Sequence, residues 1–170
     1  MKILGLKLKN YRNCKDLKLD FNYPKVLIIG KNAQGKTNIL ESVYFLSALK
    51  SPRSAYNNEL ILFGQNEFEI SAEILKADTQ ITLHYSYNCD QKKEIKINGV
   101  KSKSKEFKQV LKTVLFSTTD LLLLRGAPQD RRDWLDRAIS QIYPAYDDRL
   151  SKYEKIRIQK NNLLKDAAKS

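Results

Sequence analysis

The sequence predicts an α/β fold, a mixed sheet with an antiparallel β layer followed by the start of a helical lobe. Three observations predict it. A glycine-rich loop at residues 30–37 joins an apolar run to a helical pattern. The middle third of the chain holds several alternating, strand-like segments. After residue 117 the apolar residues recur with helical spacing to the end of the chain.

The composition indicates a globular domain with a basic surface. Of the 170 residues 42% are hydrophobic, and 31 Lys and Arg stand against 19 Asp and Glu, which gives a formal net charge of +12. No apolar run approaches the roughly 20 residues that span a membrane, so we expect a cytoplasmic protein without a membrane segment. The two cysteines are not spaced as metal ligands. The basic excess favours a polyanionic partner about as much as a simply solvated surface.

The first third of the chain predicts a hairpin, a buried strand and a helix. Residues 2–9 and 17–21 alternate around a turn at 10–13, as in an antiparallel hairpin. Residues 25–29 are continuously apolar, which is typical of a strand buried on both faces. A helix is expected from Thr37, and Pro52 ends it. Its predicted apolar face consists of Ile39, Leu40, Val43, Tyr44, Leu46 and Leu49.

The rest of the chain predicts a β layer and then helices. A short helix is expected at 57–63, strands at 67–75 and 79–88, and a hairpin around Asn98-Gly99. A further buried strand is predicted at 113–116. Helices are predicted at 130–142 and 145–164, broken at Pro144. The residues expected to form the core of these helices are Trp134, Leu135, Tyr146, Leu150, Tyr153 and Ile156.

A phosphate-binding loop is the motif that carries chemistry. Residues 30–37 fit G-x-x-x-x-G-K-[ST] at every fixed position, between a predicted strand and a predicted helix. Backbone N–H groups of such a loop wrap a phosphate, and the helix dipole adds positive potential. The lysine reaches the β- and γ-phosphates, and the hydroxyl is a Mg²⁺ ligand. The candidate nucleotide ligands are Gly30, Lys31, Asn32, Ala33, Gln34, Gly35, Lys36 and Thr37, with Thr37 also the candidate Mg²⁺ ligand.

A phosphate loop indicates binding but does not identify a reaction. Hydrolysis also needs a carboxylate on the metal, usually at the end of a second buried strand. The run 113–116 ends in Ser117, with Asp120 the nearest acid, and the run 121–124 ends in Arg125. Neither segment is a convincing metal-binding strand, so no catalytic residue is assigned.

Several segments in order resemble the RecF family of DNA replication and repair ATPases, relatives of the SMC and Rad50 heads. The opening at residues 8–13, LKNYRN, is similar to the family's L-x-N-[FY]-R-N. Residues 30–41, GKNAQGKTNILE, are similar to its G-x-N-x-x-G-K-T-N-x-L-E. Further matching segments are ELI at 59–61 with FG at 63–64, KING at 96–99, LFS at 115–117 through DL at 120–121, and RGAPQDRRDWLD at 125–136.

The resemblance implies a P-loop NTPase of ABC/SMC-head type. It implies binding of ATP with Mg²⁺ and of DNA, single-stranded or as a gapped duplex, in recombinational gap repair and the SOS response, with RecO and RecR as partners. Two such heads sandwich ATP, so an ATP-dependent homodimer is implied for a full-length form. Arg12 and Asn13 would lie near the nucleotide. Thr119 stands where the family usually has an acidic residue, so the resemblance assigns it no metal role.

The resemblance also bears on domain organisation. Residues 1–117 would form the ATP-binding lobe and residues 118–170 a partial helical lobe. Family members are about twice as long, so we expect this chain to stop before the signature motif and the metal-carboxylate strand. Two alternatives stay open: a small P-loop kinase, or a non-enzymatic fragment whose composite site is incomplete.

The basic residues of the C-terminal third permit two interpretations. They could contact a DNA backbone, or they could form a solvated helix face paired with nearby acids, for example Asp133 with Arg137 and Asp148 with Lys152. The lone histidine, His84, is interpreted as structural. The candidate DNA-contacting residues are Arg125, Arg131, Arg132, Arg137, Arg149, Lys152, Lys155 and Arg157.

Overall fold

The computed structural model describes residues 1–54, 56–118, 120, 126–143 and 145–167. The chain divides into two compact units, residues 1–115 and residues 116–170, and each is described by itself. The break predicted at Pro144 lies outside the described residues.

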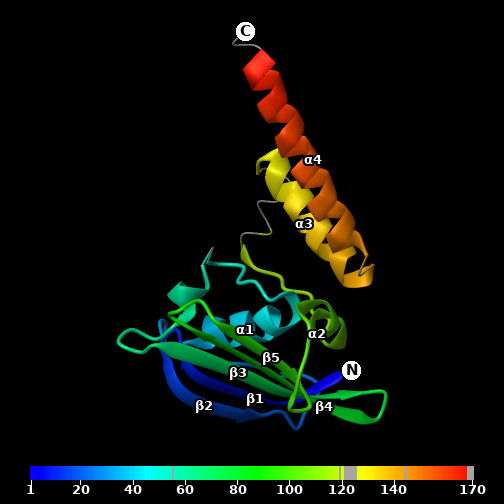
Figure 1. Ribbon diagram of the computed structural model, residues 1–170. Coiled ribbons are helices and arrows are strands. Elements are labelled where there is room, and N and C mark those ends of the chain that lie inside the picture. The colour runs from blue at the N-terminus through cyan, green and yellow to red at the C-terminus, as the bar shows by residue number, and fades with distance from the viewer. Residues whose placement is uncertain (55, 119, 121–125, 144, 168–170) are drawn as a thin grey trace. The chain divides into compact units, whose positions relative to one another are not determined.

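The first unit is built on a six-stranded sheet in the order β2-β1-β3-β4-β5-β6 (Figure 1). Every pairing in this sheet is antiparallel, so the predicted hairpins form as expected. The strands are β1 (Lys2–Tyr11), β2 (Cys14–Asp20), β3 (Glu67–Lys76), β4 (Thr79–Asn88), β5 (Lys93–Ile97) and β6 (Val100–Lys101).

Two helices lie on one face of the sheet, α1 (Lys36–Ala48) and α2 (Ser104–Val110) (Figure 1). Helix α2 was not predicted from the sequence. Alternate residues of β1, β3 and β4 point to this face and are buried, whereas their neighbours point to the opposite face. A 3₁₀ turn, η1 (Asn57–Leu60), forms within the predicted short helix.

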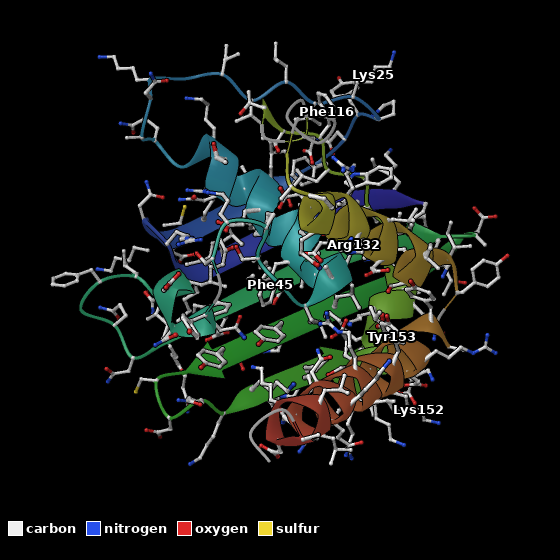
Figure 2. The ribbon with its side chains drawn as sticks, turned by 90° about the horizontal axis from the view of Figure 1, so that it is seen from above. Lys25, Phe45, Phe116, Arg132, Lys152 and Tyr153 are labelled. Atoms are coloured by element: carbon white, nitrogen blue, oxygen red, sulfur yellow. The ribbon has the colours of Figure 1, made fainter. Side chains whose placement is uncertain are left out.

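Aromatic rings fill the space between α1 and the sheet. Phe45 on α1 lies over the strands (Figure 2) and meets Tyr85 edge-to-face with ring centroids 4.8 Å apart. Tyr11 and Phe68 make a similar contact at 5.4 Å. These four side chains are almost fully buried, and such edge-to-face pairs stabilise beyond the area they bury. They fix the position of α1, and therefore of the loop that precedes it.

Two predicted buried strands do not form. Residues 25–29 and 113–116 have no strand structure, and Leu27 is 84% exposed while Val114 is 99% exposed. A strand exists only when its backbone groups pair with a neighbour. Neither segment has such a partner among the described residues, so an apolar run alone was an insufficient signal.

The buried side of α1 also differs from the prediction. Leu40, placed on the apolar face, is exposed, whereas Glu41 and Ser42 are buried together with Phe45 and Leu46. The reason is electrostatic, because Glu41 has arginine partners on that side of the helix. A carboxylate paired in this way can be buried where an apolar side chain was expected.

The second unit consists mainly of two helices, α3 (Pro128–Ile142) and α4 (Tyr146–Ala167), close to their predicted bounds. Their expected core is not buried, because Trp134, Leu135 and Tyr153 are exposed. Two helices bury only the seam between them, which leaves their other apolar residues in solvent. No helix in the described ranges is long and apolar enough to cross a membrane.

Candidate nucleotide-binding site

The phosphate loop has the backbone that its glycines permit. Gly30 has φ +153° and Gly35 has φ +90°, both in the region that favours glycine. Helix α1 begins directly afterwards at Lys36, so its first N–H groups face the loop. The Lys36 Nζ donates to the carbonyls of Gly30 at 2.7 Å and Lys31 at 2.6 Å. The ammonium group is therefore held inside the loop that it would share with a phosphate.

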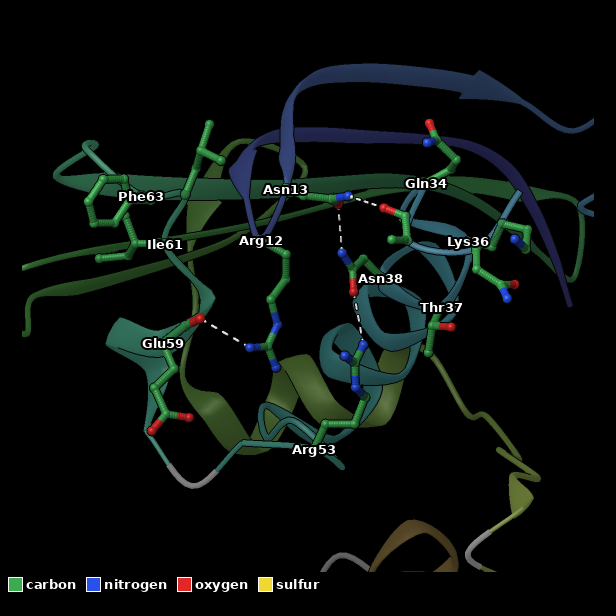
Figure 3. A pocket seen from close by; sticks show the side chains of 14 residues that line it. Arg12, Asn13, Gln34, Lys36, Thr37, Asn38, Arg53, Glu59, Ile61 and Phe63 are labelled. Atoms are coloured by element: carbon green, nitrogen blue, oxygen red, sulfur yellow. Dashed lines mark hydrogen bonds between the residues drawn. The ribbon is translucent and has the colours of Figure 1, made fainter. Parts of the chain in front are cut away.

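The turn between β1 and β2 packs against this loop. The Asn13 Nδ2 donates to the Ala33 carbonyl at 3.0 Å, and the Asn38 Nδ2 donates to the Asn13 Oδ1 at 2.7 Å (Figure 3). A Cβ atom at Gly35 would lie 2.9 Å from the Asn13 Oδ1, which is too close for a side chain. The loop, the turn and the start of α1 thus hold one another in place.

Arg12 precedes Asn13 and is anchored by a buried carboxylate. Its Nη2 and Nε donate to the two Glu41 carboxylate oxygens at 2.7 and 3.1 Å. Its Nη1 also donates to the Glu59 carbonyl at 3.1 Å (Figure 3). Arg12 has φ +56°, an uncommon conformation for a side-chain-bearing residue. The two-point ion pair holds the guanidinium at the edge of the site.

Glu41 is the centre of a wider network. Its side chain is 1% exposed, Ser51 donates to Oε1 at 2.5 Å, and the Arg53 Nη1 lies 3.4 Å from Oε2. Arg53 also donates to the Asn38 Oδ1 at 2.9 Å (Figure 3). Burial alone would raise the pKa of Glu41. The hydrogen bonds from Arg12 and Ser51 and the two arginine charges outweigh burial and lower that pKa below its ordinary value.

These groups surround a cavity of about 620 Å³. Its lining residues are Arg12, Asn13, Asn32, Ala33, Gln34, Gly35, Lys36, Thr37, Asn38, Arg53, Glu59, Ile61, Leu62 and Phe63. Of the residues predicted to bind nucleotide, Gly30 and Lys31 do not line the cavity and instead supply carbonyls to Lys36. The structure brings all the other predicted residues to its wall.

The site fits Mg²⁺ carried by a nucleotide better than a metal held by the protein alone. Thr37, which carries a hydroxyl, is among the residues that line the cavity. Among the described residues no group of three or more His, Cys, Asp or Glu side chains could hold a metal ion. Mg²⁺ commonly keeps several waters and takes phosphate oxygens alongside one or two protein ligands. A single protein hydroxyl, that of Thr37, is consistent with Mg²⁺ held mainly by phosphate oxygens and water.

Sequence reasoning missed three polar residues of this site, Asn38, Glu41 and Arg53. The first two lie inside the 30–41 motif, so the motif itself was an available signal. Arg53 lies 16 residues after the loop ends in sequence and reaches the site only because the chain turns back after α1. No local pattern marks it.

The other described residues singled out from the sequence do not line this cavity. His84 shares a hydrogen bond with the Ser71 hydroxyl across two strands at 2.9 Å, and its structural role stays a prediction. On the helices, Arg132 bonds to Gln129, and Arg157 forms an ion pair with Glu154 at 2.5 Å. Thr119 and Arg125 lie outside the described residues.

Comparisons with known proteins match the chain to a family model and to curated relatives. The family model described as AAA ATPase domain matches residues 1–168. The chain is 40% identical over 168 residues to the DNA replication and repair protein RecF of Natranaerobius thermophilus, and 39% identical over 166 residues to that of Bacillus cytotoxicus. Each match covers 97% of this chain and 44% of the relative. The chain thus spans less than half the length of these curated relatives.

Solved structures show the same likeness. A structure of the recombination mediator protein RecF with ATP, in the RecFOR pathway, matches with a TM-score of 0.88 and 35% identity, over 97% of this chain and 45% of that one. An SMC ATPase structure matches with a TM-score of 0.67 at 18% identity, over 81% of this chain and 99% of that one, which supports the fold alone. The P-loop fold of ABC/SMC-head type is therefore confirmed, and the chain belongs to the AAA ATPase domain family, with RecF proteins among its relatives.

Proposed function

We propose that this chain is the nucleotide-binding part of a RecF-like protein that binds ATP with Mg²⁺ and binds DNA in recombinational repair. The observation that carries the ATP part is the cavity in which the phosphate loop, the start of α1 and the β1–β2 turn converge. The likeness to a RecF–ATP structure over 97% of the chain supports it.

The polarity of the cavity supports a nucleotide phosphate. Lys36 and the N-terminus of α1 provide positive potential at the loop. Arg12 and Arg53 carry two positive charges on the opposite wall, where the carboxylates of Glu41 and Glu59 balance them, so the net positive potential of the cavity comes from the loop end. An anion with several charges, such as a triphosphate, suits the positive potential at the loop end of the cavity.

The cellular role of the protein is inferred from its relatives and is part of the same proposal. A RecF-like protein would act in the cytoplasm, in gap repair and the SOS response, with RecO and RecR. It would pair with a second head around ATP, so we expect very low ATP turnover from this chain alone. The small-kinase alternative requires a compact parallel sheet, whereas the sheet of the described residues is antiparallel throughout.

Binding of a fluorescent ATP analogue, followed by anisotropy, tests the nucleotide site. Lys36→Ala removes a charge-assisted contact to phosphate and should weaken binding about 10- to 100-fold. Lys7→Ala removes one exposed lysine from β1, outside the cavity, and should leave the affinity unchanged. Equal affinity of Lys36→Ala and the unmodified protein would contradict the proposed site.

A further inference from the structure

A second and larger cavity, of about 700 Å³, lies at the opposite end of α1 from the phosphate loop. It is built entirely within the first unit, from the end of α1 and the segment after it, β4, β5 and α2. Its lining residues are Ala48, Leu49, Lys50, Ser51, Ser54, Tyr56, Asn57, Asn58, Tyr85, Tyr87, Gln91, Lys93, Ser104 and Lys108.

The charge of this cavity is one-sided. Lys50, Lys93 and Lys108 line it, and no Asp or Glu is among the lining residues that the structure describes. The cavity on α3 and α4 is different, because its arginines are accompanied by Asp136 and Glu154. Lysines from three separate segments thus border one hollow, and this charge favours an anionic ligand over a cationic one.

The cavity also offers an aromatic surface and polar groups. Tyr56 is 68% exposed, so its ring face is accessible. Tyr85 and Tyr87 are buried and contribute an aromatic floor, where the Tyr85 hydroxyl accepts a hydrogen bond from the Asn57 Nδ2 at 3.2 Å. Asn58 and Gln91 add exposed amides. Cations beside an open aromatic ring and amides are the groups that bind single-stranded nucleic acid.

We propose that this cavity is a contact site for single-stranded DNA, in which Lys50 and Lys93 hold backbone phosphates and Tyr56 stacks on a base. The inference rests on the proposed DNA-binding function and places that function on the first unit. The inference does not place DNA binding on helices α3 and α4, where basic residues had been singled out from the sequence. An acidic peptide would also meet the lysines, and the test below includes it; the combination of cations, an open aromatic ring and amides favours single-stranded DNA.

The test measures binding of a labelled oligothymidine to the whole chain by anisotropy at several salt concentrations. Single-stranded binding loses about 0.7 in the slope of log K against log salt for each phosphate contact removed. Lys50→Ala/Lys93→Ala should therefore flatten the slope by about 1.4. The matched control is Lys7→Ala/Lys15→Ala, which removes the same charge from β1 and β2 outside the cavity and should leave the slope unchanged.

Substitution of Tyr56 tests the proposal without changing the charge of the cavity. Tyr56→Ala removes the stacking surface and should weaken oligothymidine binding about fivefold or more. Tyr56→Phe keeps the ring and should bind as the unmodified chain does. Circular dichroism spectra that superimpose on that of the unmodified chain would establish that each variant is folded.

The outcomes separate this inference from the proposed function. If the unmodified chain binds oligothymidine and both pocket variants keep its affinity and slope, the DNA site is elsewhere and the inference is overturned while the proposed function stands. If a poly-glutamate peptide binds with a loss at Lys50→Ala/Lys93→Ala and oligothymidine does not bind, the cavity is a protein-binding site. Absence of any DNA binding overturns the inference and the DNA part of the proposed function, whereas ATP binding is judged separately through Lys36.

Discussion

Replacing Glu41 by alanine should destabilise the first unit by about 3 kcal/mol. Removing one partner of a buried ion pair costs roughly 3–5 kcal/mol, because the remaining charge is left uncompensated. Here the carboxylate is 1% exposed, but Arg12 is 17% exposed and Arg53 47% exposed, so both guanidinium groups regain some hydration. The expected loss therefore lies at the lower end of that range.

Urea unfolding followed by two probes measures this loss. Near-ultraviolet circular dichroism reports the packed ring cluster of the first unit, while fluorescence of the single tryptophan, Trp134, reports the second unit. With a slope of about 1.5 kcal/mol per M of urea, a loss of 3 kcal/mol moves the midpoint down by about 2 M. The loss is read from the near-ultraviolet signal, and the Trp134 signal records the second unit separately.

The control is Glu69→Ala, which breaks an exposed ion pair between Lys9 and Glu69 of similar length, 2.8 Å. Such a pair contributes about 0–1 kcal/mol, so the midpoint should move by roughly 0.7 M or less. Combining Glu41→Ala with Arg12→Ala should cost clearly less than the sum of the two single changes. Equal shifts for Glu41→Ala and Glu69→Ala, or strict additivity of the pair, would refute the buried network as the cause.

Four further variants test the geometry of the first unit. Gly35→Ala forces a side chain into the left-handed region and against Asn13, so ATP-analogue binding should fall at least tenfold while the far-ultraviolet spectrum is kept. Tyr11 has a buried hydroxyl without a hydrogen-bond partner among the described residues, so Tyr11→Phe should be neutral or stabilising by up to about 1 kcal/mol in urea. Tyr85→Phe loses a hydrogen bond and should be destabilising instead. The folded pKa of Glu41 lies below its ordinary value of 4.5, so the ionised carboxylate contributes its full stabilisation of the folded unit above pH 4.5. This stabilisation is lost as the pH falls through the folded pKa. A Glu41→Gln variant lacks this titration, so its stability should depend less on pH in acid unfolding.

The elements that the sequence predicted are those whose signals are local. Asn98-Gly99 marks a hairpin because both residues adopt positive φ, and they do so here with φ +51° and +78°. The phosphate loop is predictable because its chemistry demands particular residues at fixed spacing. Alternation predicts β3 and β4 because one face of each is buried by α1 and α2.

The failures concern features that depend on a distant partner. Residues 25–29 and 113–116 have the composition of strands, but strand structure requires a neighbour, which is not found among the described residues. The exposure of Trp134 and Leu135 has the same origin, because an apolar helix face is buried only where another element covers it. Composition indicates that a segment can be buried, and only the fold decides whether it is.

Glu41 shows why the site residues come from segments that are separate in the sequence. Its carboxylate is an acid within an otherwise uncharged stretch of α1, and it can be buried only if cations reach it from other elements. Arg12 comes from the β1–β2 turn and Arg53 from the segment after α1, and both also line the candidate nucleotide cavity. Because Arg12 is covalently joined to Asn13, fixing the first on Glu41 holds the second against the Ala33 carbonyl. A residue that does not itself line the cavity thus aligns the turn with the phosphate loop, which a motif search limited to ligand positions would not detect.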